Sequence, residues 1–419
     1  MTASAALAPR ARNELRDGWR VLCAALIGAG LSFPSVPFYS IGIFAPVLAR
    51  EFAWSFASIF AGLAIASVVA LIVGPFAGYL VDRLGARRMA AATLVGFGLS
   101  FMTLALSQGS LVQFYTSWVL IAATGVGTSI AVTRAVNGAF TLRRGLALGI
   151  TLAGVGLFAF GVKPLGAWLI ATLGWRASLV VIGLLPLTVG SGAVLWGFAA
   201  GPASASLNGA AVNAGVELSG LTVNQALRTR VFWTMLVTFT LAAFAVGGPL
   251  PNIENILRTA HMDASAIVTL ASVIGLSQLT GRLVAGWLID RAWAPLIGAV
   301  VLLGAALGSW MLSQHVLSYH TTMLAIAGIG LAGGVEIDLL SYLVSRYIGL
   351  RRYGVIYGAM YGLYVVSASF APSLFARAFD RTGTYAQVLQ GGAYLLAAAA
   401  AVLLSLGRYP INSRKILNP

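Results

Sequence analysis

Long apolar stretches, separated by short loops that carry arginine, make up most of this chain. Each stretch has roughly the twenty residues that an α-helix needs to cross the hydrocarbon core of a bilayer. One such stretch could be a core helix of a soluble protein, but a dozen could not. The pattern predicts an all-α, polytopic membrane protein with twelve transmembrane helices, near residues 21–48, 55–80, 88–108, 111–141, 145–172, 177–199, 230–257, 264–289, 293–313, 319–345, 354–378 and 385–407.

The single long polar stretch, residues 200–227, is rich in Gly, Ala, Ser and Asn and separates six spans from six. This composition is typical of a flexible linker. The predicted organisation is therefore two six-helix bundles joined by a linker. Its parts are an N-terminal tail (1–20), the first bundle (21–199), the linker (200–229), the second bundle (230–407) and a C-terminal tail (408–419).

The placement of arginine predicts the orientation of the chain. Loops on one side hold most of the basic residues, whereas the other side holds only Arg50, Arg176, Arg258, Arg377 and Arg381. Cytoplasmic loops carry the excess of Lys and Arg in membrane proteins. Both termini are therefore predicted to be cytoplasmic, and the inner (plasma) membrane is the expected location.

Composition agrees with this class and excludes several functions. Only 9% of the residues are charged, against about a quarter in soluble proteins. The net charge of +15 belongs to the loops and not to one basic face, so a nucleic-acid partner is not expected. The single Cys23 excludes an internal disulfide and a Cys-rich metal site. No phosphate-binding Gly-Lys-Ser/Thr loop, catalytic constellation or cofactor motif is present, so an enzyme is not expected.

Two motifs recur at one offset and indicate a duplication. Gly78-x-x-x-Asp82-Arg83 is repeated as Gly286-x-x-x-Asp290-Arg291, and Leu142-Arg143-Arg144 as Leu350-Arg351-Arg352. Both pairs are separated by 208 residues, since 286 − 78 and 350 − 142 agree. A shared offset in independent motifs indicates a parallel repeat of a six-span unit.

The segment between spans 2 and 3 resembles the loop motif of the major facilitator superfamily. It is Gly74-Pro-Phe-Ala-Gly78-Tyr-Leu-Val-Asp82-Arg83-Leu-Gly85-Ala-Arg87-Arg88. The resemblance implies the fold of that superfamily, with two pseudo-symmetric bundles that rock about a cavity at the membrane midplane. It also implies a gate formed by Asp82, Arg83, Asp290 and Arg291. The alternative is that these residues only anchor the topology.

A narrower resemblance is to monocarboxylate transporters and bacterial oxalate–formate exchangers. Asp17-Gly18-Trp19 is similar to the opening motif of the former, and the segment from Phe140 to Gly154 to their span-5 motif. Arg282 in span 8 stands where both groups place a substrate arginine. The chain departs from them at Gln278, where animal members have an acid. Near Tyr39 and Val365, the aligned lysines of the two groups are missing.

Ionisable residues at membrane depth are costly and normally face a cavity or a partner. Arg282 offers a planar fork for a carboxylate, so it is predicted to bind the substrate. The alternative is a permanent salt bridge to Glu336 or Asp338. Lys163 is the second candidate cation for the substrate, or else a lysine that snorkels outward or is held by a backbone carbonyl.

Glu336 and Asp338 are two residues apart, about 200° round a helix, so they cannot share a face. Either acid could carry a coupling proton or form a structural ion pair. The offset of 208 places Asp338 opposite Ile130, one turn from Arg134. An ion pair between Arg134 and Asp338 across the two halves is therefore expected, with Arg134 close to the substrate. Glu254, near the outer end of span 7, is a candidate entrance or gate residue.

Aromatic residues in the discontinuous spans are candidates to line the cavity, although packing is the commoner role of such residues. They are Tyr39, Phe160 and Tyr364. Taken together, these features predict a secondary transporter of a small organic mono- or dicarboxylate, by proton symport or anion exchange. Efflux of amphipathic drugs and a transporter-like sensor remain the alternatives. The expected partners are the carboxylate, protons and the lipid bilayer, and a monomer is expected.

Overall fold

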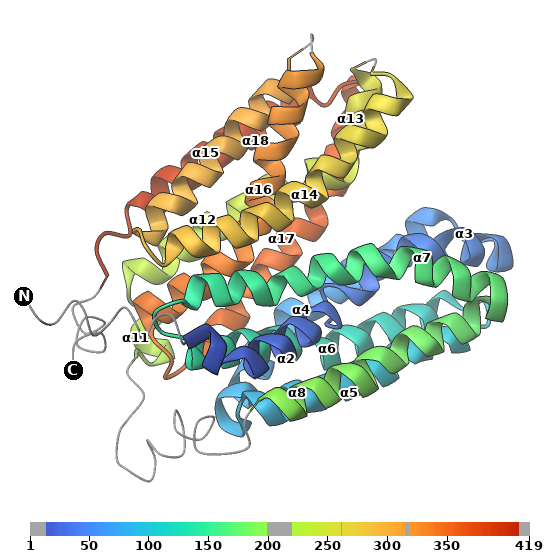
Figure 1. Cartoon of the computed structure of the whole chain (residues 1–419). Helices are drawn as coiled ribbons and strands as arrows, with labels where there is room; N and C mark the ends of the chain where they lie inside the picture. The colour runs from blue at the N-terminus through green and yellow to red at the C-terminus, as the bar shows by residue number, and fades with distance from the viewer. Residues whose placement is uncertain (1–13, 199–219, 261, 315–317, 410–419) are drawn as a thin grey trace, which may run out of the picture. The chain divides into compact units, whose positions relative to one another are not determined.

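The computed structural model describes residues 14–198, 220–260, 262–314 and 318–409 (Figure 1). Helices make up nearly all of these residues, which confirms the predicted all-α class. Within the described ranges, 9 helices are long and apolar enough to cross a membrane, and three further apolar helical stretches are shorter. The chain divides into two compact units: unit 1 is 1–221 with 349–362, and unit 2 is 222–348 with 363–419.

Unit 1 contains the spans predicted for the first half of the chain. Its helices are α2 (Trp19–Gly30), α3 (Val36–Phe52), α4 (Phe56–Leu84), α5 (Ala86–Met102), the 3₁₀ turn η1 (Thr103–Leu106), α6 (Leu111–Ala139), α7 (Arg144–Leu184), the π-helical turn η2 (Leu185–Gly190) and α8 (Ser191–Gly197). Helix α6 packs against both α4 and α5, and α2 packs along α7. Figure 1 shows α5 and α8 side by side.

Two local features explain how these spans begin and end. Predicted span 1 is divided into α2 and α3 by the segment around Pro34, which cannot continue a helical hydrogen-bond ladder. Helix α7 combines predicted spans 5 and 6, and it turns at Gly174, whose φ of +79° suits glycine. Helix α4 runs past its predicted end at residue 80, so Asp82 and Arg83 lie in its last turn.

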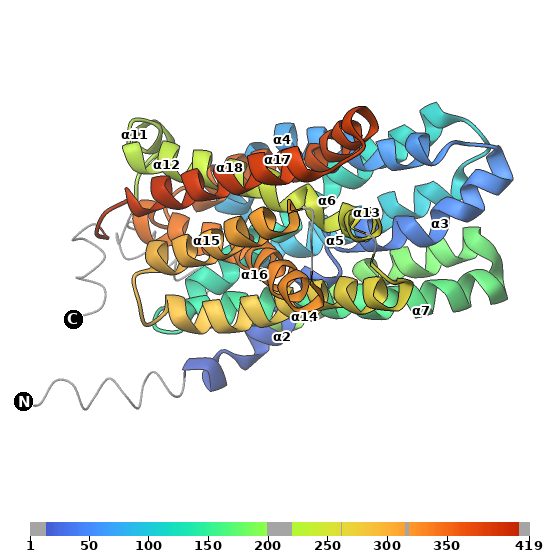
Figure 2. The ribbon, with the colours of Figure 1, turned by 90° about the horizontal axis from the view of Figure 1, so that it is seen from above.

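Unit 2 contains the spans predicted for the second half. Its helices are α11 (Val223–Leu227), α12 (Arg230–Gly247), α13 (Pro249–Thr259), α14 (Ala264–Ile289), α15 (Ala294–Leu312), α16 (Tyr319–Leu343), the π-helical turn η3 (Val344–Ile348), the later part of α17 (Tyr353–Thr382) and α18 (Ala386–Leu404). Helix α16 packs against α14 and α15, and α18 against α15 and α12. Figure 2 shows α14 beside α16.

Helix α17 is continuous, yet it contributes to both units. Its first part, up to Gly362, belongs to unit 1, and the rest belongs to unit 2. In the predicted linker (200–229), residues up to 219 lie outside the described residues. The end of that segment forms α11, which begins with a capping box at Thr222. The predicted domain bounds remain a prediction.

Candidate functional site

The first charged group lies in unit 1, where Asp82 of α4 forms an ion pair with Arg134 of α6. Both side chains are buried, with 3% and 9% of their surface exposed. The guanidinium of Arg134 also donates a hydrogen bond to the carbonyl oxygen of Leu350, at 3.2 Å. The expected pairing of Arg134 with Asp338 is therefore replaced by a pairing inside unit 1, because α4 and α6 are neighbours there.

The same carboxylate also caps the start of α17. The backbone N–H groups of Gly354 and Val355 donate to the two carboxylate oxygens of Asp82, at 3.0 and 3.3 Å. The first N–H groups of a helix have no partner within the helix, and the positive end of the helix dipole favours an anion. Asp82 thus joins three helices, α4, α6 and α17, by an ion pair and two amide hydrogen bonds.

Five glycines allow α4 and α17 to approach so closely. We call them the glycine seam: Gly74 and Gly78 of α4, and Gly354, Gly358 and Gly362 of α17. They repeat every four residues, which places each set on one face of its helix. A Cβ added at Gly74 would lie 2.7 Å from the carbonyl oxygen of Gly358, and one added at Gly78 would overlap that of Gly354. The α17 glycines were missed in the sequence analysis, although their spacing was visible.

The second charged group lies in unit 2, inside α14 and α16, seven residues before the end of α14 and five before the end of α16. Arg282 of α14 faces Asp338 of α16, with a guanidinium nitrogen 3.5 Å from a carboxylate oxygen. Their side chains are 11% and 4% exposed. This distance exceeds that of an ordinary hydrogen bond, and within the described residues neither carboxylate oxygen of Asp338 has a hydrogen-bond partner. The ion pair is therefore loose.

Glu336 lies in the same helix as Asp338 but faces a different neighbour. The hydroxyl of Tyr364, on α17, donates to Glu336 Oε2 at 2.9 Å. The two acids thus point toward α17 and α14 respectively, as their spacing predicted. The Tyr364 ring is buried, so the aromatic residue expected near the cavity lies beside an acid instead of on an open wall.

The repeated gate motif has different surroundings in unit 2. Asp290 ends α14, and Arg291 lies over the ring of Trp287, 3.9 Å from its centroid. In unit 1, Arg83 lies over Tyr79 in the same way, at 4.9 Å. Burial raises the pKa of the Tyr409 phenol, and the negative charge of nearby Asp290 raises it further. The side chain of Asp290 therefore lies close to the Tyr409 phenol.

Other predicted site residues are placed only in part. Tyr39, in α3, is partly exposed and packs edge-on against Phe38. The side chains of Lys163, Phe160 and Glu254 lie outside the described part of the structure. Among the described residues, no group of three or more His, Cys, Asp or Glu side chains could hold a metal ion.

The carboxylate of Glu14 binds a loop, and no sequence motif predicted this contact. Its carboxylate accepts hydrogen bonds from the backbone N–H groups of Thr141 (2.7 Å), Leu142 (3.2 Å) and Arg143 (2.9 Å). These three amides precede α7, so the N-terminal turn holds the loop between α6 and α7. A Cβ at Gly18 would overlap the buried ring of Phe140, which explains the glycine there. No local pattern identifies such a contact, since 127 residues separate the partners.

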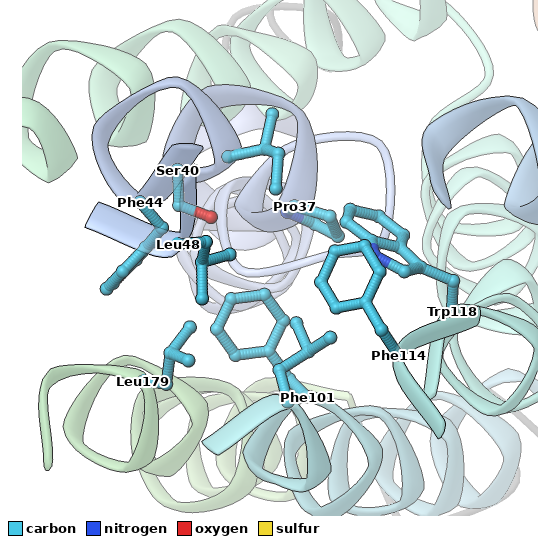
Figure 3. A pocket seen from close by; sticks show the side chains of 10 residues that line it. Pro37, Ser40, Phe44, Leu48, Phe101, Phe114, Trp118 and Leu179 are labelled. Carbon is cyan, nitrogen blue, oxygen red and sulfur yellow. The ribbon is translucent and has the colours of Figure 1, made fainter. Parts of the chain in front are cut away.

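Figure 3 shows a small cavity in unit 1 between α3 and the helices around it. Apolar side chains such as Phe44, Phe101 and Trp118 line it, and its volume of about 10 Å³ holds at most one water molecule. The hydroxyl of Ser40 donates to the carbonyl oxygen of Val36 at 2.6 Å. A cavity of this size is too small for an organic anion.

Comparison with known proteins places the chain among transporters. The sequence model of the Major Facilitator Superfamily matches residues 21–372. Monocarboxylate transporter 13 of Rattus norvegicus is 27% identical over 407 residues, which cover 95% of this chain and 91% of that protein. The gallate transporter of Pseudomonas putida is 26% identical, covering 80% of this chain and 83% of that protein.

A solved structure has the same fold at low sequence identity. The fucose:proton symporter FucP of Escherichia coli is 14% identical, with a TM-score of 0.67, and the match covers 93% of this chain and 98% of that chain. This likeness supports the predicted twelve-helix architecture. It carries no information on the substrate, because the identity is so low.

Proposed function

The chain belongs to the major facilitator superfamily, and from this premise we propose that it is a secondary active transporter of a small organic carboxylate. The observation that carries the proposal is the loose ion pair between Arg282 and Asp338 in unit 2. Charged groups at the middle of a membrane span normally mark a substrate or ion path. An arginine there has the geometry to bind a carboxylate through two parallel hydrogen bonds.

The proposed binding step is an exchange of partners. Asp338 is a counter-ion of Arg282, yet among the described residues neither of its carboxylate oxygens has a hydrogen-bond partner. A substrate carboxylate that reaches Arg282 with two short N–H···O bonds would displace Asp338. The arginine would keep an anionic partner, and the two short bonds to the substrate would have to outweigh the cost of leaving the Asp338 carboxylate without its close cation.

The relatives support a carboxylate more than another anion. One is a monocarboxylate transporter, and another is a gallate transporter. Both names denote carboxylate substrates, and one of them is aromatic. We further propose that Lys163, Tyr39 and Phe160 contribute to the substrate cavity, with Lys163 as a second cation for dicarboxylates.

We propose that Asp82 forms the cytoplasmic gate together with Arg134 and the glycine seam. Alternating access requires contacts that form in one state and break in the other. The bonds of Asp82 to the start of α17 are well suited to this, since they join segments 272 residues apart. The arginine-rich loops of both units would face the cytoplasm. Asp290 and Arg291 would form the corresponding gate of unit 2, and Glu254 would lie at the gate near the outer end of span 7.

Ligand-induced thermal stabilisation of the purified protein tests the proposal, because a ligand that binds only the folded state raises the melting temperature. The panel is formate, lactate, oxalate, benzoate and gallate. At least one should stabilise the wild type, and Arg282→Ala should abolish the shift. Arg381→Ala, which alters an exposed arginine of α17, should retain it.

Four results are informative. Loss of the shift in Arg282→Ala alone supports a site with one cation, whereas loss in Lys163→Ala as well supports a dicarboxylate clamp. A wild-type protein that no carboxylate stabilises contradicts the proposal. So does an Arg282→Ala protein that is folded and still responds.

A further inference from the structure

Glu336 and Asp338 have different chemical surroundings, although they are two residues apart. Asp338 has the cation Arg282 at 3.5 Å. Glu336 is 3% exposed, and no basic nitrogen within the described residues lies within 4.0 Å of it. Its Oε2 accepts from Tyr364, while its Oε1 has no hydrogen-bond partner among the described residues.

The helices packed against α16 supply little charge at this level. Helix α15 has no titratable residue, and α12 has only Arg230, at its first position. Helix α14 contributes Arg282, which faces Asp338, and α17 contributes Tyr364. An ionised carboxylate that is buried without a cation costs far more free energy than a neutral carboxyl group. Asp338, which has a cation beside it, therefore suits the ionised state, and Glu336, which has none among the described residues, suits the protonated state.

We propose that Glu336, and not Asp338, carries the proton that drives transport, and that Tyr364 passes its state of charge to α17. The inference rests on the proposed function, which leaves the driving ion open. The proton would bind to Glu336 Oε1 from one side of the membrane and leave from the other. Asp338 would remain the counter-ion that the substrate displaces from Arg282.

The connection to the gate runs along a single helix. Tyr364 lies ten residues after Gly354 in α17, about 15 Å along a continuous helix. A hydroxyl donates a stronger hydrogen bond to a carboxylate than to a neutral acid. Protonation of Glu336 would therefore weaken the tie between α16 and α17. The same helix begins with the amides that bind Asp82, so a change at Tyr364 can reach the gate.

The test uses the full-length protein in liposomes and two assays with labelled lactate, or with labelled gallate if only gallate stabilises the wild type. One assay measures exchange of the labelled anion at equal pH, which needs no net proton movement. The other measures uptake driven by an inward proton gradient. Glu336→Gln should lower the ratio of driven uptake to exchange at least tenfold. Asp338→Asn should lower both activities together, and Tyr364→Phe should lower the ratio less.

An infrared measurement keeps the inference testable if Glu336→Gln does not fold. The wild type should show a pH-dependent carbonyl band of a protonated carboxyl group. Tyr364→Phe should shift this band, because it removes the hydrogen bond to Oε2, and Asp338→Asn should leave it in place. Absence of the band in the wild type would overturn the inference.

Two transport results would also overturn it. One is an unchanged ratio in Glu336→Gln, and the other is a wild type that exchanges carboxylates but ignores the proton gradient. Both leave the carboxylate site at Arg282 standing. A wild type that neither binds nor exchanges any carboxylate instead contradicts the proposed function itself.

Discussion

The two halves of this chain are repeats of one another, yet they hold their buried charges at different places. In unit 1, the ion pair of Asp82 and Arg134 lies at the end of α4, where amides of α17 complete it. In unit 2, the pair of Arg282 and Asp338 lies further inside its helices, more than one turn before the ends of α14 and α16, and is loose. Neighbouring amides complete the first pair, whereas in the second neither carboxylate oxygen of Asp338 has a hydrogen-bond partner among the described residues.

The offset of 208 residues shows how the halves diverged. Arg282 corresponds to Gly74 of the glycine seam, and Asp338 corresponds to Ile130. Arg134 corresponds to Tyr342, so the acid of the second motif, Asp290, has no arginine at the matching position. One scaffold thus carries the proposed substrate charge in one half and the proposed gate charge in the other. A helix face that packs closely through glycine cannot also hold a long cationic side chain.

The largest effect is expected when apolar residues replace the charged pair of unit 2. Unit 1 already has uncharged residues at the two matching positions. Arg282→Met alone leaves Asp338 as an uncompensated buried charge, which should destabilise the protein by about 3–5 kcal/mol. The double change Arg282→Met with Asp338→Leu should restore most of that stability, since apolar replacements of buried ion pairs are often neutral. Thermal unfolding measures both.

A measurement of substrate binding distinguishes loss of the binding site from a change in protein stability alone. The double variant should be folded but should show no stabilisation by any carboxylate. A double variant that still binds substrate would show that unit 2 does not hold the anion through Arg282, and the comparison between the halves would fail.

The next effect concerns the two motif acids. Asp82→Asn loses a charge that accepts two amide bonds and pairs with Arg134, and such charge-assisted bonds contribute about 1.5–3 kcal/mol. Asp290→Asn removes a charge beside the Tyr409 phenol, and we expect it to lower uptake less than Asp82→Asn does. Uptake of the labelled carboxylate in cells, corrected for the amount of inserted protein, compares the two. Equal losses of uptake in the two variants would contradict this difference between Asp82 and Asp290.

A third prediction addresses the glycine seam. Gly358→Ala adds a methyl group against α4, and overpacking of this kind costs about 1–3 kcal/mol. Transport should fall roughly five- to a hundredfold, because each 1.4 kcal/mol corresponds to a factor of ten. Gly391→Ala is the matched control, since a Cβ there meets nothing within 4 Å. If both variants transport normally, close packing of α17 on α4 is not required.

The smallest effect is expected at Glu14. Glu14→Gln weakens the bonds to the three amides before α7, and we expect a loss of about 1 kcal/mol in the free energy of unfolding. Glu51→Gln is the control, because its pair with Arg176 is exposed on both sides and such pairs contribute about 0–1 kcal/mol. A melting temperature that falls only in Glu51→Gln would contradict this ranking.

Much of the architecture was predictable because lipid imposes strong rules on a sequence. Apolar stretches marked the spans, including the two that α7 joins at Gly174. The repeat of Asp82 and Asp290 marked the duplication. Arg282 stood out as a charge inside an apolar span. Such signals are local, and a bilayer strengthens them, since lipid-exposed backbone must satisfy its polar groups within a helix or a closed barrel.

The partners of the buried charges could not be predicted in the same way. The sequence favoured a bond between Arg134 and Asp338 and offered a salt bridge from Arg282 to Glu336 or Asp338 only as an alternative, whereas the structure pairs Arg134 with Asp82 and Asp338 with Arg282. It also gave no indication that Glu14 would hold the loop before α7, or that Glu336 would face Tyr364.

By itself, then, the sequence determined the class, the spans, the repeat and the residues that carry charge into the membrane. The tertiary structure decided which charges meet. The physical reason is that hydrophobicity and helix periodicity act along the chain, whereas an ion pair depends on which helices become neighbours and on their rotation. A turn of one helix by a single residue moves a side chain by about 100° and changes its partner.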